Sequence, residues 1–581
     1  MGAESIFASS TGIFSCPEPF GVISLFQTTN MRSVRQSRLL WLALCAGVGP
    51  LAPQARAIIT FGGTGNEFGT PPGNVGIYEG SFNGYTGTAI TSNMLISANH
   101  LLLGFNNTFV YNNGTMTATT YAVQVVASLD DLSVLQIAPN QSGTFTLSAP
   151  IYTGSGEAGS TMVDVGKGYA RGGVTTGGWG WVANTMGSTW GTNTVSAIDT
   201  DTELGLSGAF GGDFLQYDFD NEDPSSPNYN ADECIVTPGD SGGGVFIDVG
   251  GQYQLAGVNS LVDGAYDSMG NLISGSLYDA YGYYEKDSNN NLVEITQHVP
   301  ESSFATRISS KLNFVGLADG TIPSANAAAY PINDDGQLTV YSNLTTGAIT
   351  GGASITVGNG TNANPKLKIA SNSGGSAISS LIVDSGSTLD ITNNHIFIAY
   401  GSATDPIASI AAWIASGYAG GTWTGLGITS SAAQSNSGSY GIGYADSADP
   451  GNPAGLSSGT IEIKYTLLGD ANLDGKVNGT DFTILATNFN RSVTDGWDEG
   501  DFNYDGKVNG GDFLLLAQNF NQSASQSASQ SAVSAADMGA LDAFAAANGL
   551  SVPEPGSAGM LVVAALGILH RRRSALSSTT F

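Results

Sequence analysis

The stretch that most constrains the fold of this chain reads TPGDSGGG and runs from Thr237 to Gly244, directly before the apolar residues 245–247. A serine nucleophile in acyl transfer needs a tight, exposed turn with backbone N–H groups aimed at the developing oxyanion. Glycines permit such a turn because they carry no Cβ. In a chain with 80 glycines, the same letters also fit an ordinary glycine-rich turn before a strand. The choice therefore depends on other motifs.

Two upstream segments supply partners for that serine. The apolar, strand-like segment 89–98 ends in Asn99-His100, and Asp130-Asp131 leads into the β-type run 132–135. The chain order His, Asp, Ser is one of the orders in which catalytic triads occur. These motifs resemble those of the chymotrypsin/trypsin-like serine proteases, which carry TAAH, DIAL and GDSGG at the corresponding places. The resemblance covers roughly residues 58–315.

The resemblance implies a mainly β, chymotrypsin-like double β-barrel and gives roles to its residues. Ser241 would be the nucleophile and His100 the general base, then the general acid. Of two adjacent carboxylates, Asp131 matches the family pattern better than Asp130, because DLSVL starting at Asp131 is close to DIALL. The oxyanion hole would consist of the backbone N–H groups of Gly239 and Ser241.

The same resemblance implies a specificity pocket. Six residues before Ser241 stands Ile235, where members that cleave after basic residues hold a carboxylate. Ser260 would lie in the strand that pairs with substrate, and Val262 would replace a glycine that keeps the pocket open. An apolar floor and a narrowed wall favour small apolar residues before the scissile bond.

A route to activation is also implied. In the family, a newly freed N-terminal Ile pairs its ammonium with the Asp before the nucleophile, which here is Asp240. Cleavage after Ala57 would free Ile58. A buried ammonium and a buried carboxylate need each other, because either alone is costly. The chain departs from the family's Ile-Val-Gly-Gly, since Thr60 and Phe61 come before its glycines.

Residues 316–465 form a second region that is poor in charge and rich in Ser, Gly, Asn and Thr. Short alternating apolar runs, such as 367–369 and 381–383, are typical of short strands with frequent turns. A β-sandwich and a short β-solenoid both fit this pattern. We see no catalytic set here and expect His395 to be a structural or surface histidine rather than a ligand. In the preceding domain, we expect that His298 is not catalytic.

A twelve-residue loop occurs twice after residue 467, each time followed by an amphipathic stretch. Calcium is a hard cation that needs oxygen ligands, a backbone carbonyl at loop position 7 and a sharp glycine turn at position 6. Both copies fit, with Asp rather than Glu at position 12. We therefore predict two Ca²⁺ sites and no cofactor for catalysis. The predicted ligands are Asp470, Asn472, Asp474, Lys476, Asn478 and Asp481 in the first loop, and Asp501, Asn503, Asp505, Lys507, Asn509 and Asp512 in the second.

The duplication resembles a type I dockerin, a small α-helical calcium module, over 466–522. The resemblance implies a cohesin-like assembly partner, which the family recognises with help from loop positions 10 and 11. These positions commonly hold a Ser/Thr pair, but here they are Gly479-Thr480 and Gly510-Gly511. The calcium pattern is intact while the recognition pattern is not. We expect residues 523–551, which begin with a Ser/Ala/Gln tract, to be a flexible linker.

Both ends carry targeting patterns. Arginines, an apolar run and an Ala-x-Ala site predict a secretory signal peptide over 31–57, and residues 1–30 look like a mis-assigned start. Residues 552–574 hold Pro-Glu-Pro, a short apolar run and an arginine cluster, and resemble a PEP-CTERM sorting signal; a plain membrane anchor is the alternative. The resemblance implies exosortase-type sorting, with transient anchoring, to the bacterial cell surface or extracellular matrix.

Charge and cysteine content narrow the function classes. The net charge of −30 argues against nucleic acid as a partner, because nothing would neutralise its phosphates. Of three cysteines only Cys234 follows the predicted signal peptide, so no intramolecular disulfide is expected there. Our leading hypothesis is a secreted or surface-directed serine endopeptidase that acts on proteins or peptides. The alternative is a non-catalytic protease-fold adhesion or scaffold protein.

Overall fold

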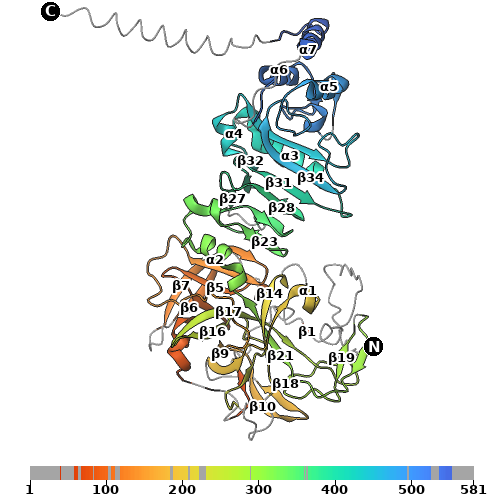
Figure 1. Ribbon diagram of the computed structural model, residues 1–581. Coiled ribbons are helices and arrows are strands. Elements are labelled where there is room, and N and C mark those ends of the chain that lie inside the picture. Colours follow the sequence, from red (N-terminus) through yellow and green to blue (C-terminus); the bar gives the residue numbers. More distant parts are fainter. Residues whose placement is uncertain are drawn as a thin grey trace, which may run out of the picture.

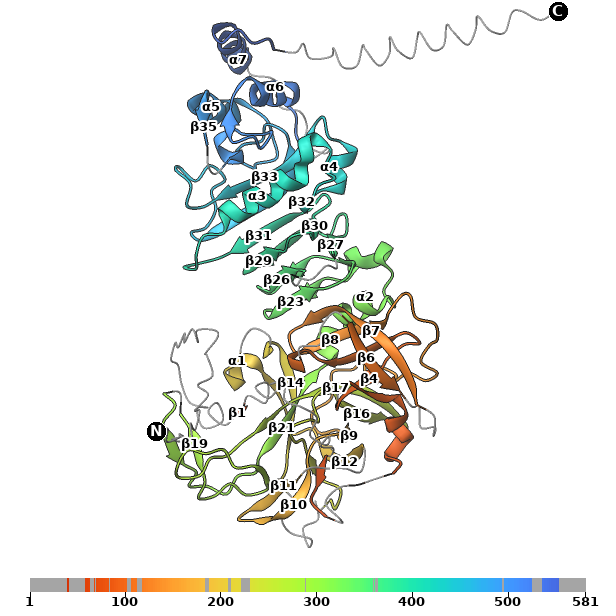
Figure 2. The same ribbon diagram turned by 180° about the vertical axis from the view of Figure 1, so that it is seen from behind.

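The computed structural model describes residues 39–40 and 58–552, except for 63–66, 68, 83, 102–105, 112–117, 183–187, 207–209, 221–229, 288, 359, 361–363, 494–495 and 525–534. The extension 1–30, most of the predicted signal peptide and residues 553–574 of the predicted sorting signal lie outside the described residues. Figures 1 and 2 show three parts in a row: a large β part, a stack of short strands, and a helical part in blue. Within the described ranges, no helix is long and apolar enough to cross a membrane.

A closed barrel forms the first half of 58–315. Its hydrogen-bonded order is β7-β6-β3-β4-β5-β8, and β7 also pairs with β8, which closes the ring. The strands are rich in β-branched and aromatic residues, and Phe82, Phe109 and Leu135 are buried inside. The strands are β3 (Glu79–Phe82), β4 (Tyr85–Ala89), β5 (Met94–Ala98), β6 (Asn106–Tyr111), β7 (Thr119–Leu129) and β8 (Leu132–Ile137).

The second half carries a separate sheet in the order β12-β9-β16-β17-β21-β14-β13, to which the short β1 (Leu39–Leu40) adds at β17. Its end strands form no ladder with each other among the described residues. Instead, Asn193 of β12 donates a side-chain hydrogen bond to the Asp218 carbonyl of β14 at 2.9 Å. The described residues therefore contain one closed barrel and one open sheet, where the resemblance implied two closed barrels. The strands are β9 (Thr161–Gly166), β12 (Thr189–Thr194), β13 (Ala197–Thr200), β14 (Asp213–Asp218), β16 (Gly244–Val249), β17 (Gln252–Asp263) and β21 (Ser302–Arg307).

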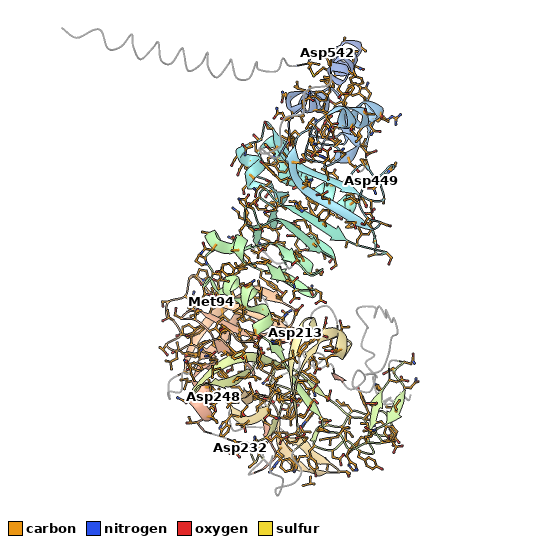
Figure 3. All side chains as sticks on the ribbon, viewed as in Figure 1. Met94, Asp213, Asp232, Asp248, Asp449 and Asp542 are labelled. Carbon is orange, nitrogen blue, oxygen red and sulfur yellow. The ribbon has the colours of Figure 1, made fainter. Side chains whose placement is uncertain are left out.

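Smaller elements complete this part. Arg307 at the end of β21 forms ion pairs with Glu157 at 2.9 Å and with Asp213, which Figure 3 labels, at 3.1 Å. These ion pairs hold β21, the last of these strands in the chain, to the adjacent strand β14 and to the loop that contains Glu157. The small elements are β2 (Ile59–Thr60), β10 (Ala170–Thr175), β11 (Gly178–Val182), α1 (Asp201–Leu204), β15 (Cys234–Ile235), β18 (Gly275–Leu277), β19 (Tyr284–Lys286) and β20 (Leu292–Glu294).

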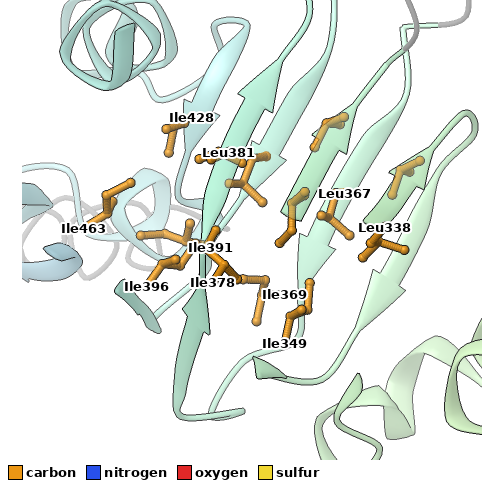
Figure 4. Close-up of a cluster of buried hydrophobic side chains, with 14 of the residues drawn as sticks. Leu338, Ile349, Leu367, Ile369, Ile378, Leu381, Ile391, Ile396, Ile428 and Ile463 are labelled. Atoms are coloured by element: carbon orange, nitrogen blue, oxygen red, sulfur yellow. The ribbon is translucent and has the colours of Figure 1, made fainter. Parts of the chain in front are cut away.

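Residues 332–399 wind into a short parallel β-solenoid, one of the two architectures that the sequence left open. Short strands of successive turns pair in parallel along its faces, as in β23-β26-β29 and β24-β27-β30. Each strand places one or two Ile, Leu or Val side chains inside, among them Leu338, Leu367 and Ile369 (Figure 4). Such short strands cannot bury a core alone, so the turns stabilise one another. The strands are β22 (Ile332–Asn333), β23 (Gln337–Val340), β24 (Leu344–Thr346), β25 (Ile349–Thr350), β26 (Ser354–Val357), β27 (Lys366–Ile369), β28 (Gly375–Ile378), β29 (Ser380–Val383), β30 (Thr388–Asp390) and β31 (His395–Ala399).

The solenoid is joined directly to the barrel. Its second strand β23 pairs antiparallel with β7, with Leu338 opposite Leu129 and Val340 opposite Ala127. One sheet thus continues from the barrel into the solenoid, and Figures 1 and 2 show the green strands resting on the orange ones. Between the two parts lie η5 (Ser309–Lys311), α2 (Leu312–Asp319) and η6 (Ser324–Ala329). Backbone pairing makes this a rigid junction.

The C-terminal part is built on the last solenoid turn. There β31 pairs antiparallel with β34, which pairs with β33, and the calcium-loop helices α5 and α6 follow. Helix α7 packs on them: Leu541 is fully buried, and the Phe544 ring lies 4.9 Å from that of Phe489. The predicted flexible linker is therefore wrong for 535–547, because Leu541 and Phe544 form an apolar stripe that needs cover. The elements are α3 (Ile407–Tyr418), β32 (Gly427–Thr429), α4 (Ser431–Ser435), β33 (Tyr440–Asp446), β34 (Thr460–Leu467), α5 (Gly479–Asn488), α6 (Gly510–Asn519) and α7 (Ala535–Ala547).

Candidate active site and candidate calcium loops

Strand pairing brings the three predicted triad residues together. His100 lies in the turn η3 (Asn99–Leu101) that follows β5, and Asp131 lies in the tight turn between β7 and β8. Because β5 pairs with β8, with Ala98 opposite Leu132, the histidine turn sits beside the aspartate turn. Ser241 comes from the other half of the molecule, just before β16 (Gly244–Val249). The site is therefore formed where the barrel meets the open sheet.

The three side chains form a continuous hydrogen-bonded chain. His100 Nδ1 lies 2.8 Å from Asp131 Oδ2, and His100 Nε2 lies 2.8 Å from Ser241 Oγ. The His100 backbone N–H also donates to Asp131 Oδ1 at 2.7 Å. A proton on Nδ1, bonded to the carboxylate, leaves Nε2 as the acceptor for the serine proton. The arrangement can deprotonate Ser241.

Two further residues contact this chain. Ser260, which we expected to face substrate, donates its hydroxyl to Asp131 Oδ2, so it holds the carboxylate in place. Phe210, which no sequence motif marks, stacks on the His100 ring with centroids 5.8 Å apart. An isolated Phe in a loop carries no pattern, so only the fold reveals its place.

The other candidate carboxylate, Asp130, is engaged elsewhere. It is fully buried and bonds to the ammonium of Lys311 rather than to His100. The structure therefore brings Asp131, and not Asp130, to the histidine. His298 lies away from the triad and bonds Asp279 at 2.8 Å, and His395 stands on β31 of the solenoid.

The turn around Ser241 needs its glycines. Gly239 has φ of 100° and Gly242 has φ of 83°, which side chains rarely adopt. A Cβ at Gly242 would lie 2.1 Å from the Thr86 carbonyl oxygen. Asp240 N–H donates to the Thr237 carbonyl at 3.0 Å, whereas the N–H groups of Gly239 and Ser241 have no partner among the described residues. These two amides are available to bind an anion.

Asp240 and Ile58, predicted as an activation pair, lie close together. The Asp240 carboxylate is buried and accepts hydrogen bonds from the N–H of Gly168 at 2.5 Å and of Thr237 at 2.7 Å. A Cβ built on Gly166 would meet both Asp240 Oδ1, at 2.1 Å, and Ile58 Cδ1, at 2.9 Å. Burial raises the pKa of Asp240 to about 8. A positive charge here would stabilise the carboxylate.

The other two predicted specificity residues lie in the hydrophobic core. Ile235 of β15 and Val262 of β17 are fully buried in one apolar cluster with Ile58 and Ile59. Ile235 stands opposite Ile59 in the β2–β15 pair. Both side chains thus belong to the core behind the nucleophile turn.

The two predicted calcium loops repeat each other in detail. Asp481 and Asp512, at position 12, accept backbone hydrogen bonds from their own loops and cap the helices that follow. Asp470 Oδ2 accepts from the Gly475 N–H at 3.0 Å, and Asp501 Oδ2 accepts from the Gly506 N–H at 2.8 Å. The loops are therefore ordered by the same residues that would bind the cation.

The first loop fits a cation by its chemistry. Asp470 is buried, and its Oδ1 has no hydrogen-bond partner. Burial, together with Asp481 and Asp474 nearby, raises the pKa of Asp470 to about 7. Buried carboxylates of this kind are stabilised by a divalent cation, which supplies the missing positive charge.

Two of the predicted calcium ligands are already engaged as helix caps. The side-chain oxygens of Asn478 and Asn509 accept from the N–H groups of Thr480 and Gly511, both at 2.8 Å, and so act as helix caps. Within the described ranges, no group of three or more His, Cys, Asp or Glu side chains is gathered as a metal site. Each loop would complete its shell with an Asn amide oxygen and the backbone carbonyl of Lys476 or Lys507.

Residues of α7 and just after it lie close to the glycines at loop position 10. A Cβ at Gly479 would lie 2.8 Å from Asp537 Oδ1, and a Cβ at Gly510 would lie 2.9 Å from Leu550 Cδ2. Both atoms are the ends of flexible side chains, so residues 535–550 cover the starts of α5 and α6 without requiring glycine there.

Comparisons with known proteins identify one region of the chain. Residues 499–540, which include the second loop, match the dockerin type I domain family. The match does not include the first loop, and it extends beyond the predicted 466–522 into α7. No curated protein matches the chain.

Among solved structures, the chain is similar to the MamO protease domain from Magnetospirillum magneticum in its apo form. That likeness has 14% sequence identity and a TM-score of 0.24, and it covers 41% of this chain and 96% of that one. At this level it carries no conclusion about fold or activity.

Proposed function

We propose that the chain is a serine endopeptidase that hydrolyses peptide bonds through an acyl-enzyme. The observation that carries this proposal is the position of His100, which bonds Asp131 through Nδ1 and Ser241 through Nε2, each at 2.8 Å. Ser241 Oγ attacks the scissile carbonyl while Nε2 takes its proton. Asp131 stabilises the resulting imidazolium, and the N–H groups of Gly239 and Ser241 bind the oxyanion. His100 then protonates the leaving amine, and a water releases the acyl group by the same steps.

A fluorophosphonate probe tests this proposal on the purified full chain. It reacts with a serine only where a base has activated the oxygen. We expect Ser241 to be labelled and Ser241→Ala to lose the label. Ser310→Ala is the matched control, because Ser310 is exposed and bonds only the Arg307 carbonyl at 3.3 Å. An unlabelled parent chain would favour the non-catalytic adhesion or scaffold function instead.

The proposed substrate preference is for small apolar residues before the scissile bond. The resemblance to trypsin-like proteases supports it, because an apolar Ile235 stands where members that cleave after basic residues hold a carboxylate; in the structure Ile235 and Val262 themselves lie in the core behind the nucleophile turn. Peptides with Ala or Val at that position should be cleaved faster than peptides with Arg or Lys. Faster cleavage after Arg would reject this specificity.

Activation by an N-terminal ammonium is a further part of the proposal. Two observations support it: the Asp240 carboxylate is buried, and the Ile58 side chain lies near it. Signal cleavage after Ala57 would then create the activating terminus directly. N-terminal sequencing of the active enzyme tests this, and full activity with an added residue before Ile58 would reject it.

The C-terminal part is proposed to bind two Ca²⁺ ions and to serve as an assembly module. The two equivalent loops support the number of sites, and the dockerin match supports a cohesin-like partner. The export signal at 31–57 and the sorting pattern at 552–574 support delivery to the bacterial surface or surrounding matrix. Calorimetric titration with Ca²⁺ should give a stoichiometry of two, and one site would contradict the first loop's role.

A further inference from the structure

A buried lysine links three regions of the chain behind the triad. Lys311 in η5 is 2% exposed, and its ammonium contacts Asp130 and, at 2.9 Å, Asp334. Asp130 belongs to the barrel turn beside Asp131, and Asp334 opens the first solenoid turn. Lysines are rarely buried unless they are paired. Burial alone would lower the pKa of Lys311, but the two carboxylates raise it, so the lysine stays charged.

The same solenoid turn fixes the backbone of Asp130. The Asp130 N–H donates to the Gln337 carbonyl at 2.9 Å, and Asp130 Oδ1 accepts from the Gln337 N–H at 2.8 Å. Asp130 has φ of 53°, a left-handed conformation that Asp tolerates in a tight turn between two strands, and both of these hydrogen bonds anchor the turn to the solenoid. Asp131 is the next residue, so its orientation depends on this turn.

A second route leads from the lysine to His100. Gly211 and Gly212 lie against the ion cluster: a Cβ at Gly211 would be 2.9 Å from Asp130 Oδ1, and a Cβ at Gly212 would be 2.5 Å from Lys311 Nζ. The preceding residue is Phe210, which stacks on the His100 ring. The cluster of Lys311, Asp130 and Asp334 therefore contacts both the turn that carries Asp131 and the segment 210–212 that packs on His100.

We propose that Lys311, Asp130 and Asp334, together with Gln337, form a clamp through which the solenoid positions Asp131 and His100 for catalysis. The four are positioning residues and touch no reacting atom. The clamp rests on the proposed peptidase function. It gives the solenoid a role in the reaction, because the catalytic half alone, 58–315, lacks Asp334 and Gln337.

Two variants of the full chain test the clamp. Asp334→Asn keeps the shape of the side chain and leaves the Lys311–Asp130 pair intact, so the protein should stay folded. Lys311→Met removes the charge and leaves two buried carboxylates, which is a harsher change. The matched control is Lys366→Gln, which breaks the Lys366–Asp390 ion pair of 2.9 Å within the solenoid. Melting temperature, kcat, KM and the rate of fluorophosphonate labelling are measured for each.

For Asp334→Asn we expect kcat and the labelling rate to fall about tenfold to a hundredfold, because small displacements of a catalytic group cost that much. KM should change by less than about twofold, since no substrate contact is lost. Lys366→Gln should keep parental values. A purely structural role would lower the melting temperature without moving kcat of the folded protein. Folded Asp334→Asn with parental kcat would overturn the clamp, whether or not Lys311→Met folds.

The clamp and the peptidase function can fail separately. If the parent chain is not labelled by fluorophosphonate, the peptidase proposal fails, and the clamp is judged by NMR of the His100 imidazole. A changed His100 chemical shift in Asp334→Asn, absent in Lys366→Gln, would support the clamp. Unchanged shifts in both would overturn it.

Discussion

The candidate active site and the first calcium loop each hold a buried carboxylate, and the two differ in whether both oxygens have hydrogen-bond partners. At the triad, Asp131 has partners on both oxygens: the backbone N–H of His100 on Oδ1, and the His100 ring and the Ser260 hydroxyl on Oδ2. In the first calcium loop, Asp470 Oδ1 is buried without a hydrogen-bond partner, and burial raises the pKa of Asp470 to about 7. The comparison teaches that the carboxylate of the first site has its hydrogen-bond partners as folded, while that of the second has an oxygen left for the proposed cation.

The largest effect should come from breaking the complete site. Asp131→Asn removes the charge that stabilises the imidazolium and favours the wrong histidine tautomer, so kcat should fall about ten-thousandfold. Ser241→Ala and His100→Ala should each cost at least about a thousandfold, because triad members act as a unit. Hydrolysis of a chromogenic peptide measures this. Near-parental activity in Asp131→Asn would mean that this carboxylate is not the catalytic one.

Removal of calcium should disrupt the calcium loops and leave the triad intact. A calcium chelator should unfold the loop region and leave peptide hydrolysis within about twofold of the parent, since metal binding and folding are coupled only where the ligands lie. Trp497 is buried and donates to the Asp470 carbonyl at 2.7 Å, so its fluorescence should change on unfolding. Loss of hydrolysis with chelator would show that the two sites are not independent.

Leu541→Ala tests whether α7 belongs to the calcium region. Leu541 is fully buried, and truncation of such a leucine costs about 2–5 kcal/mol of unfolding free energy. Leu514→Ala in α6 is the matched control: Leu514 is 41% exposed and should cost less than about 0.5 kcal/mol. Calcium-loaded denaturant unfolding measures both. Equal effects would place α7 outside the folded unit.

The smallest expected effect concerns Glu79. Like Asp470 and unlike Asp131, it has a buried carboxylate oxygen with no hydrogen-bond partner among the described residues. Its Oε1 accepts from Thr88 at 2.7 Å, but Oε2 is buried without a partner, and burial raises its pKa to about 8. The folded state then binds this proton more tightly than the unfolded state, so stability falls as the pH rises from about 4.5 to about 8. The melting temperature of the parent should fall over this pH range, and that of Glu79→Gln should fall by at least about 2 °C less than the parent's. An unchanged pH slope would contradict the raised pKa.

Local motifs made much of the candidate chemistry predictable. His100, Ser241 and the glycine turn stand in contiguous patterns, and each calcium loop spans only twelve residues, so their geometry follows from neighbours along the chain. The β character of 316–465 was also readable, but the choice between sandwich and solenoid was not. Strands such as β27 (Lys366–Ile369) show the same alternation in both, and only their parallel pairing with β24 and β30 decides.

The sequence by itself determined the mainly β class and which residues are candidates for nucleophile, base and loop ligands, because each depends on residue types at short, fixed spacing. Only the tertiary structure decided the supports of the site: Ser260 on Asp131 across 129 positions, Lys311 on Asp130 across 181, and Gln337 on Asp130 across 207. It also decided the open second sheet and the docking of α7. The physical reason is that these contacts join residues far apart in the chain, and which of many compatible partners meet is fixed by how the sheets close and stack.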